Sequence, residues 1–136
     1  MEHNNLITRG ENTIVFDFDG TLAFHPGGLG PPGEPIEGMP ELLRELKEFG
    51  YTIVIQSCRG ASYWKGLIKD HLASPHTQFK FIKKWCETYD VPCDVVWSED
   101  KPLAFLYVDD RGCFFNGDAQ DLREKLVKRK VMEVSE

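Results

Sequence analysis

The 136-residue sequence lacks several features that would place it in a common class of proteins. Lysine and arginine total 16 against 22 aspartate and glutamate residues, so the chain has no cationic excess of the kind that general polyanion binders carry. The four cysteines form no CxxC pair, and no histidine lies at zinc-finger spacing from them, which argues against a structural zinc site. Reduced thiols in a cytoplasmic protein are therefore expected.

Long apolar segments are also absent. The longest apolar run spans residues 103–108, far short of the ~20 residues that a membrane-spanning helix needs. The first 12 residues are polar and lack the apolar stretch of a signal peptide. We expect a soluble, cytoplasmic protein with no membrane partner. With 41% hydrophobic residues, the whole chain (1–136) is expected to form one domain with a real core.

The spacing of apolar residues predicts strands that alternate with helices. Strands are expected at residues 13–18, 51–56, 95–97 and 103–108, and helices at residues 39–49, 62–72, 77–89 and 119–130. Such alternation is typical of a three-layer α/β/α, Rossmann-like fold with a central, mainly parallel sheet. In the last helix, Leu122 and Leu126 are expected to face the core, with Asp118 as the cap.

The segment after the first strand has an unusual composition. Eight of the ten residues at 26–35 are glycine or proline. In parallel sheets the ligand site lies beyond the carboxyl ends of the strands, where this loop (residues 22–38) begins. We expect the loop to form a flap over the site, with a plain surface connector as the alternative.

Carboxylates follow two of the predicted strands. Asp17 and Asp19 end the first strand, and Asp109 and Asp110 end the fourth. Four carboxylates at neighbouring strand ends repel one another, so a cation is expected among them. Hard oxygen ligands with no convergent histidine or cysteine favour Mg²⁺ over zinc. All four aspartates are candidate metal ligands.

Two further polar residues are expected at the same edge of the sheet. Ser57 ends the second strand and offers a hydroxyl, and Lys101 precedes the fourth strand and offers an ammonium group. Carboxylates, a hydroxyl, a lysine and Mg²⁺ are the groups that stabilise charge on a transferring phosphoryl group. The combination predicts a phosphoryl-transfer site.

These residues lie in motifs that resemble those of the haloacid dehalogenase-like phosphatase superfamily. FDFDGTL (residues 16–22) resembles its first motif, IVIQS (residues 53–57) its second, Lys101 its third and YVDD (residues 107–110) its fourth. The spacing leaves no room for the usual cap insertions, so the chain resembles a minimal, capless member. A weaker resemblance, through SCR (residues 57–59), is to the phosphatase domain of polynucleotide kinase-phosphatases.

The superfamily resemblance implies roles for these residues. Asp17 would attack phosphorus and form an aspartyl-phosphate, and Asp19 would act as general acid and base while its backbone carbonyl reaches the metal. Ser57 would donate a hydrogen bond to the phosphoryl group, and Lys101 would neutralise it.

The same resemblance implies roles for the acidic pair that ends the fourth strand. Asp110 is the expected direct Mg²⁺ ligand and Asp109 the expected partner of Lys101, although these adjacent carboxylates could exchange roles.

Substrate contacts are expected from residues that follow the strands. Arg59, two residues after Ser57, would clamp a phosphate through its guanidinium, with a structural ion pair as the alternative. Thr21 and Arg111 complete the predicted substrate-binding set. Cys58 is excluded as a nucleophile because a cysteine-phosphatase loop needs an arginine where Trp64 stands.

The function expected from these observations is Mg²⁺-dependent hydrolysis of a phosphomonoester. An alternative with the same reaction mechanism but a different substrate is a polynucleotide 3′-phosphatase. The phosphorylated substrate is therefore expected to be either a small molecule or a nucleic-acid end. A non-catalytic phosphate-binding or signalling module is the alternative of another class. Because capless sites are open, a homo-oligomer in which a neighbouring subunit supplies a lid is a further hypothesis.

Overall fold

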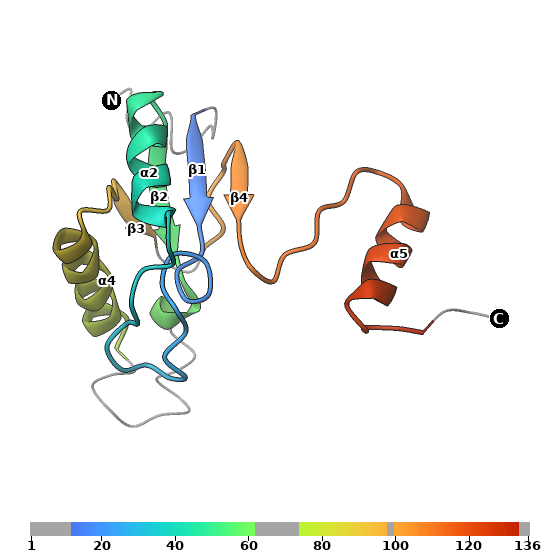
Figure 1. Cartoon of the computed structure of the whole chain (residues 1–136), viewed down its shortest axis with the longest axis horizontal. Coiled ribbons are helices and arrows are strands. Elements are labelled where there is room, and N and C mark those ends of the chain that lie inside the picture. The colour runs from blue at the N-terminus through green and yellow to red at the C-terminus, as the bar shows by residue number, and fades with distance from the viewer. Residues whose placement is uncertain (1–11, 62–73, 98–99, 134–136) are drawn as a thin grey trace.

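The computed structural model describes residues 12–61, 74–97 and 100–133 (Figure 1). In chain order the elements are β1 (Thr13–Phe16), α2 (Met39–Glu48), β2 (Thr52–Gln56), the 3₁₀ turn η1 (Cys58–Gly60), α4 (Pro75–Tyr89), β3 (Val95–Trp97), β4 (Leu106–Val108) and α5 (Ala119–Lys128). The helix predicted at residues 62–72 lies outside the described residues.

The described strands form one parallel sheet in the order β3-β2-β1-β4. The first strand, β1, is therefore central, with β2 on one side and β4 on the other. Phe16 at the end of β1 is in register with Ile55 of β2 and with Val108 of β4. All the carboxyl ends lie at one edge of the sheet, where the sequence predicts the site.

One face of the sheet carries the main hydrophobic core. Alternate side chains of β1 and β2, such as Phe16 and Ile55, pack with Leu43 of α2 and with Ile82 and Trp85 of α4. The fully buried aliphatic side chains each stabilise the fold by roughly 1.5–3 kcal/mol relative to exposure. Because α2 and α4 both contribute to this cluster, they cover the same face of the sheet (Figure 1).

The opposite face is buried as well. Val15 of β1 is 4% exposed and Val54 of β2 is fully buried. Strands buried on both faces are those of a three-layer α/β/α arrangement. The predicted Rossmann-like α/β fold with a parallel sheet is confirmed, and the described residues contain no large cap domain.

Local chemistry explains where the described helices begin. Pro40 and Pro75 each occupy the first turn of a helix, where the missing N–H has no intrahelical partner to lose. Helix α4 therefore begins two residues before the predicted start. Asp118 caps α5 as predicted, because its side chain accepts a hydrogen bond from the N–H of Gln120.

The carboxyl-terminal part of the chain differs from the prediction. Strand β4 starts at Leu106 rather than at residue 103, because its paired residues begin opposite Ile14 of β1. Helix α5 buries none of its residues and lies apart from the sheet (Figure 1). The expectation that Leu122 and Leu126 face the core is therefore wrong, since both are only half-buried.

No helix in the described part of the chain is both long enough and apolar enough to cross a membrane.

Candidate functional site

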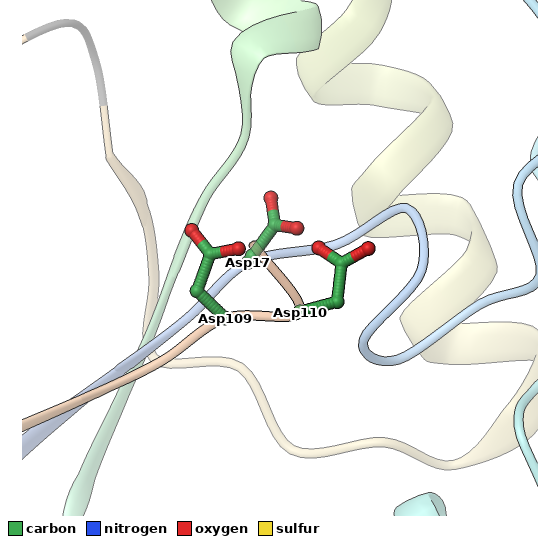
Figure 2. A group of neighbouring side chains, drawn as sticks. All are labelled: Asp17, Asp109 and Asp110. Carbon is green, nitrogen blue, oxygen red and sulfur yellow. The ribbon is translucent and has the colours of Figure 1, made fainter. Parts of the chain in front are cut away.

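Strand register brings the predicted acidic residues together. Because Phe16 is paired with Val108, Asp17 and Asp109 are the next residues along two adjacent strands. The Asp17 N–H donates a hydrogen bond of 2.9 Å to the Val108 carbonyl, which continues the ladder past the end of β1. One carboxylate oxygen from each of Asp17, Asp109 and Asp110 lies within 4.8 Å of the others. Figure 2 shows the three carboxylates on the same side of the backbone.

Gly20 allows the loop after β1 to approach this cluster closely. Its φ of +87° belongs to the left-handed region, which favours glycine. A Cβ atom at this position would lie 2.4 Å from Oδ2 of Asp110. Any other residue here would therefore strain the backbone and push against Asp110, which explains the glycine of the first motif.

The Asp17 carboxylate lies in an unfavourable environment for a charge. Burial raises the pKa of Asp17 from 3.8 to about 7, and the neighbouring carboxylates of Asp109 and Asp110 contribute in the same direction. The backbone hydrogen bond at Phe18 opposes part of this rise in pKa. No lysine or arginine of the described residues forms an ion pair with these three carboxylates. A bound cation would restore the charge of Asp17 at neutral pH.

The donor set fits a hard divalent cation such as Mg²⁺. The cluster offers only carboxylate oxygens, which are the ligands that Mg²⁺ prefers. Asp109 and Asp110 are exposed, so water can complete the coordination shell, as Mg²⁺ usually requires. Oδ1 of Asp109 already accepts a 2.8 Å hydrogen bond from the N–H of Arg111, whereas the described residues donate no such backbone bond to Asp110.

Asp19 is held separately from this cluster. Its two carboxylate oxygens accept hydrogen bonds from Arg59, at 2.6 Å from Nε and 3.1 Å from Nη2. The side chain of Arg59 is 1% exposed and that of Asp19 is 8% exposed. The ion pair that is the alternative interpretation of Arg59 is therefore present, with Asp19 as its partner. A role of Asp19 at a metal through its backbone carbonyl stays a prediction.

Ser57 and Cys58 follow β2 directly, beside the end of β1. The Ser57 hydroxyl accepts a 3.2 Å hydrogen bond from the N–H of Arg59 and so caps η1, which sequence reasoning missed. Burial raises the pKa of the Cys58 thiol, and the charges of Asp17 and Asp19 raise it further. A thiol that stays protonated is a poor nucleophile, which supports the exclusion of cysteine-phosphatase chemistry.

The structure does not show the expected pairing of Lys101 with Asp109. The ammonium Nζ of Lys101 instead lies 4.6 Å from the centroid of the Tyr107 ring, and the described residues show no ion pair between Lys101 and Asp109. The Tyr107 hydroxyl donates a hydrogen bond to the carbonyl of Pro102. The ring held in this way offers the Lys101 ammonium a cation–π contact.

The other predicted substrate-binding residues contact the cluster. The Thr21 hydroxyl donates a long, 3.4 Å hydrogen bond to Oδ2 of Asp17. Arg111 is exposed and follows the acidic pair, with its backbone N–H bound to Asp109. Contact of either side chain with a substrate stays a prediction.

Gln78 of α4 binds the site residue Arg59, although it is not among the candidate site residues predicted from the sequence. It is fully buried, its Oε1 accepts a 3.0 Å hydrogen bond from Nη1 of Arg59, and its Nε2 donates to the Leu29 carbonyl at 2.8 Å. The signal was available in the sequence, because Gln78 lies four and seven residues before Ile82 and Trp85 on one helical stripe. A polar residue on an apolar stripe predicts a buried partner.

The Gly/Pro-rich loop is tied to the body of the protein by side chains. Nη1 of Arg59 donates to the Gly30 carbonyl at 2.7 Å, and the indole N–H of Trp85 donates to the Gly33 carbonyl at 2.8 Å. Motion of this loop as a flap stays a prediction.

A cavity of about 460 Å³ lies elsewhere, where the end of α4 meets β3. Its described lining includes Cys86, Cys93 and Asp94, but none of the predicted site residues. Of the predicted site residues, Asp109 and Asp110 are exposed at the edge of the sheet.

No family model matches the sequence, and no curated protein matches it. Among solved structures, a conserved protein from Bacteroides thetaiotaomicron is similar, with a TM-score of 0.53 and 23% identity over 87% of this chain and 90% of that one. A protein from Vibrio cholerae has a TM-score of 0.48 and 24% identity, over 87% of this chain and 98% of that one. The first of these similarities supports the fold and nothing further.

Proposed function

We propose that the protein is a Mg²⁺-dependent phosphatase of phosphomonoesters that works through an aspartyl-phosphate on Asp17. The observation that carries the proposal is the cluster of Asp17, Asp109 and Asp110 at adjacent strand ends, whose mutual repulsion calls for a cation. The resemblance of residues 16–22 to the first motif of haloacid dehalogenase-like phosphatases supports the same assignment.

The two aspartates of this motif would divide the chemistry. An oxygen of Asp17 forms a bond to phosphorus while the bond from phosphorus to the leaving oxygen breaks, and Asp19 gives that oxygen a proton. Asp19 then takes a proton from water, whose oxygen attacks phosphorus and releases inorganic phosphate and the Asp17 carboxylate. A bound Mg²⁺ would supply charge that stabilises the phosphoryl oxygens.

Ser57 and Lys101 would support the transferring group. The Ser57 hydroxyl accepts from the Arg59 N–H, and its own O–H can still donate to a phosphoryl oxygen. Lys101 would have to leave the Tyr107 ring to reach the phosphoryl group. A cation–π contact at an exposed position is worth only about 0.5–1 kcal/mol, so it would oppose such a movement of Lys101 weakly.

The openness of the site bears on the substrate class. Asp109, Asp110 and Arg111 are all exposed, so the site can accept a phosphate on a large molecule as well as on a small one. Sugar phosphates, nucleotides and nucleic-acid ends are the substrates to compare.

The test is phosphate release from a panel of sugar phosphates, mononucleotides and 3′-phosphorylated oligonucleotides, with Mg²⁺ and with a chelator. Asp17→Asn is the catalytic control, and Asp90→Asn, an exposed aspartate at the end of α4, is the matched control for the substitution itself. Mg²⁺-dependent release that Asp17→Asn abolishes and Asp90→Asn preserves is expected. Release that is indifferent to Mg²⁺ or to Asp17 would refute the proposal. Activity on oligonucleotides should also fall steeply with salt if a nucleic-acid end is the substrate.

A further inference from the structure

Arg59 is the largest fully buried side chain of the described residues. Arg59 lies in the 3₁₀ turn η1, two residues after Ser57, which caps that turn. The same short turn therefore positions both the Ser57 hydroxyl, which is predicted to bind the phosphoryl group, and the Arg59 guanidinium. A buried guanidinium is strongly unfavourable unless its N–H groups are paired. Where these N–H groups are bound therefore indicates what Arg59 does.

One side of the guanidinium binds the predicted acid. Nε and Nη2 donate to the two oxygens of Asp19 in a bidentate ion pair, which fixes the plane of the carboxylate as well as its position. The Asp19 side chain is 8% exposed, so water cannot easily replace this pairing.

The other side of the guanidinium binds the Gly/Pro-rich loop. Nη1 donates to the Gly30 carbonyl at 2.7 Å and to Gln78 at 3.0 Å, and Gln78 in turn donates to the Leu29 carbonyl. Two adjacent carbonyls of the loop are thus connected, through two buried side chains, to the Asp19 carboxylate.

A second contact joins the same parts of the molecule. Phe18, between Asp17 and Asp19, packs edge-on against Trp85 with ring centroids 4.9 Å apart, and Trp85 binds the Gly33 carbonyl. The guanidinium carbon of Arg59 lies 5.8 Å from the centroid of the Phe18 ring. The loop is therefore tied to the first motif both by hydrogen bonds and by packing.

We propose that Arg59 is a positioning residue, which orients the Asp19 carboxylate and couples it to the Gly/Pro-rich loop through Gly30 and Gln78. This assignment rests on the proposed phosphatase function, and it replaces the role of Arg59 as a clamp on substrate. With its guanidinium engaged on both sides by protein groups, Arg59 acts through Asp19.

The chemistry of the leaving group makes this role measurable. A general acid matters most when the leaving oxygen is a poor leaving group, as in an alkyl phosphate, and least when it leaves readily, as in p-nitrophenyl phosphate. The ratio kcat/KM reports the steps up to formation of the aspartyl-phosphate, so it isolates the acid role of Asp19 from its later role as a base.

In the first experiment, kcat/KM is measured for Arg59→Gln on glycerol 2-phosphate and on p-nitrophenyl phosphate. We expect a loss of about 100-fold on the alkyl ester and of less than about 10-fold on the aryl ester, since general acids contribute roughly 10²–10⁴-fold. Arg44→Gln, at an arginine on the exposed side of α2, is the matched control and should change neither value. Equal losses on both esters would overturn the proposal, because a merely structural or phosphate-clamping arginine lowers both alike.

Because removal of Arg59 leaves a buried aspartate unpaired, Arg59→Gln is first checked for folding by circular dichroism. If Arg59→Gln does not fold, Arg59→Lys is measured instead, because lysine keeps the positive charge but cannot bind both oxygens of Asp19 at once. Its loss of kcat/KM should again be larger on the alkyl ester than on the aryl ester, but by a smaller factor. A wild-type protein that hydrolyses neither ester nor any member of the panel would refute the proposed function itself, and with it this role.

The coupling to the loop has a readout that is independent of activity. The N–H groups of Phe24 and Ile36 close the loop, through hydrogen bonds to Glu34 and Leu22. In Gln78→Leu we expect their hydrogen exchange to accelerate by at least about 10-fold, with no change in Gln120→Leu, an exposed glutamine of α5. Unchanged exchange in Gln78→Leu would overturn the coupling, even in an active phosphatase.

Discussion

The two sides of the candidate site are held in opposite ways. On the β1 side, Asp19 is buried and both of its oxygens are bound by Arg59, which is itself tied to α4 and to the Gly/Pro-rich loop. On the β4 side, Asp109 and Asp110 are exposed, and an extended segment leads from them to a helix that lies apart from the sheet (Figure 1).

The difference follows from strand position. Strand β1 is central and all four of its residues are buried, whereas β4 is an edge strand of which Leu106 and Tyr107 are exposed. A central strand can hold reacting groups with little freedom, and an edge leaves room for water, a cation and a substrate of any size. In the proposed phosphatase, the site would therefore combine a fixed acid, Asp19, with an open edge where Asp109 and Asp110 would hold the metal.

The largest expected effect is that of Asp17→Asn, at the junction of the two sides. An amide cannot attack phosphorus, so we expect kcat for phosphate release to fall by at least about 1,000-fold. Thermal unfolding of the same variant should show an intact fold. Residual turnover near the wild-type value in the folded variant would refute Asp17 as nucleophile.

The next effect concerns the exposed side. Because one oxygen of Asp109 already accepts from the Arg111 N–H, Asp110 is the freer ligand. We expect Asp110→Asn to raise the Mg²⁺ concentration for half-maximal activity by at least about 10-fold, and Asp109→Asn to raise it less. A metal titration of the two variants decides this, and a larger effect at Asp109 would reverse the assignment.

The third effect is a change of stability with pH, which is expected in the absence of metal. With a pKa of about 7 in the folded protein against 3.8 normally, Asp17 holds a proton that the unfolded chain releases. Stability, and with it Tm, should therefore fall as pH rises from about 4 to about 7, because the folded state binds more protons. Thermal unfolding in chelator should show this slope, and Asp17→Asn or added Mg²⁺ should reduce it. A slope unchanged by Asp17→Asn would show that a different group causes the pH dependence.

The smallest effect is expected in the separate helix. Helices α2 and α5 both have ten residues, but Leu43 of α2 is fully buried while Leu126 of α5 is only half-buried. Leu126→Ala should lower the free energy of unfolding by less than about 0.5 kcal/mol, and the matched Leu43→Ala by about 2–5 kcal/mol. Denaturant unfolding measures both. A large effect of Leu126→Ala would show that α5 packs against the rest of the protein in solution. The contrast between the β1 side and the β4 side of the site would then be wrong.

Much of the fold could be predicted because it depends on local patterns. The apolar runs around Ile14 and Ile53 placed the two central strands, and Asp118 marked the start of the last helix. Strand β4 was predicted too long because its length depends on how many residues β1 offers for pairing. The separate position of α5 could not be predicted, since an amphipathic pattern indicates an apolar face without indicating what covers it.

The candidate site divides in the same way. The order of Asp17, Asp19 and the Asp109–Asp110 pair along the chain predicted that they would meet at one edge, and the register brings Asp17 to the acidic pair. The partner of Asp19 could not be predicted, because Arg59 is 40 residues away in the chain and Gln78 is further still. Lys101 shows the converse, since the superfamily resemblance implied Asp109 as its partner, whereas the structure has the Tyr107 ring beside the ammonium.

By itself, the sequence determined the class of fold and the set of acidic residues at the strand ends, because periodicity and strand order depend on near neighbours in the chain. Only the tertiary structure decided which of those residues are buried, and that Arg59 neutralises Asp19 while no described lysine or arginine forms an ion pair with the other three. Burial and pairing depend on side chains from distant segments, and the energy of a buried charge is set by those partners rather than by its own residue type.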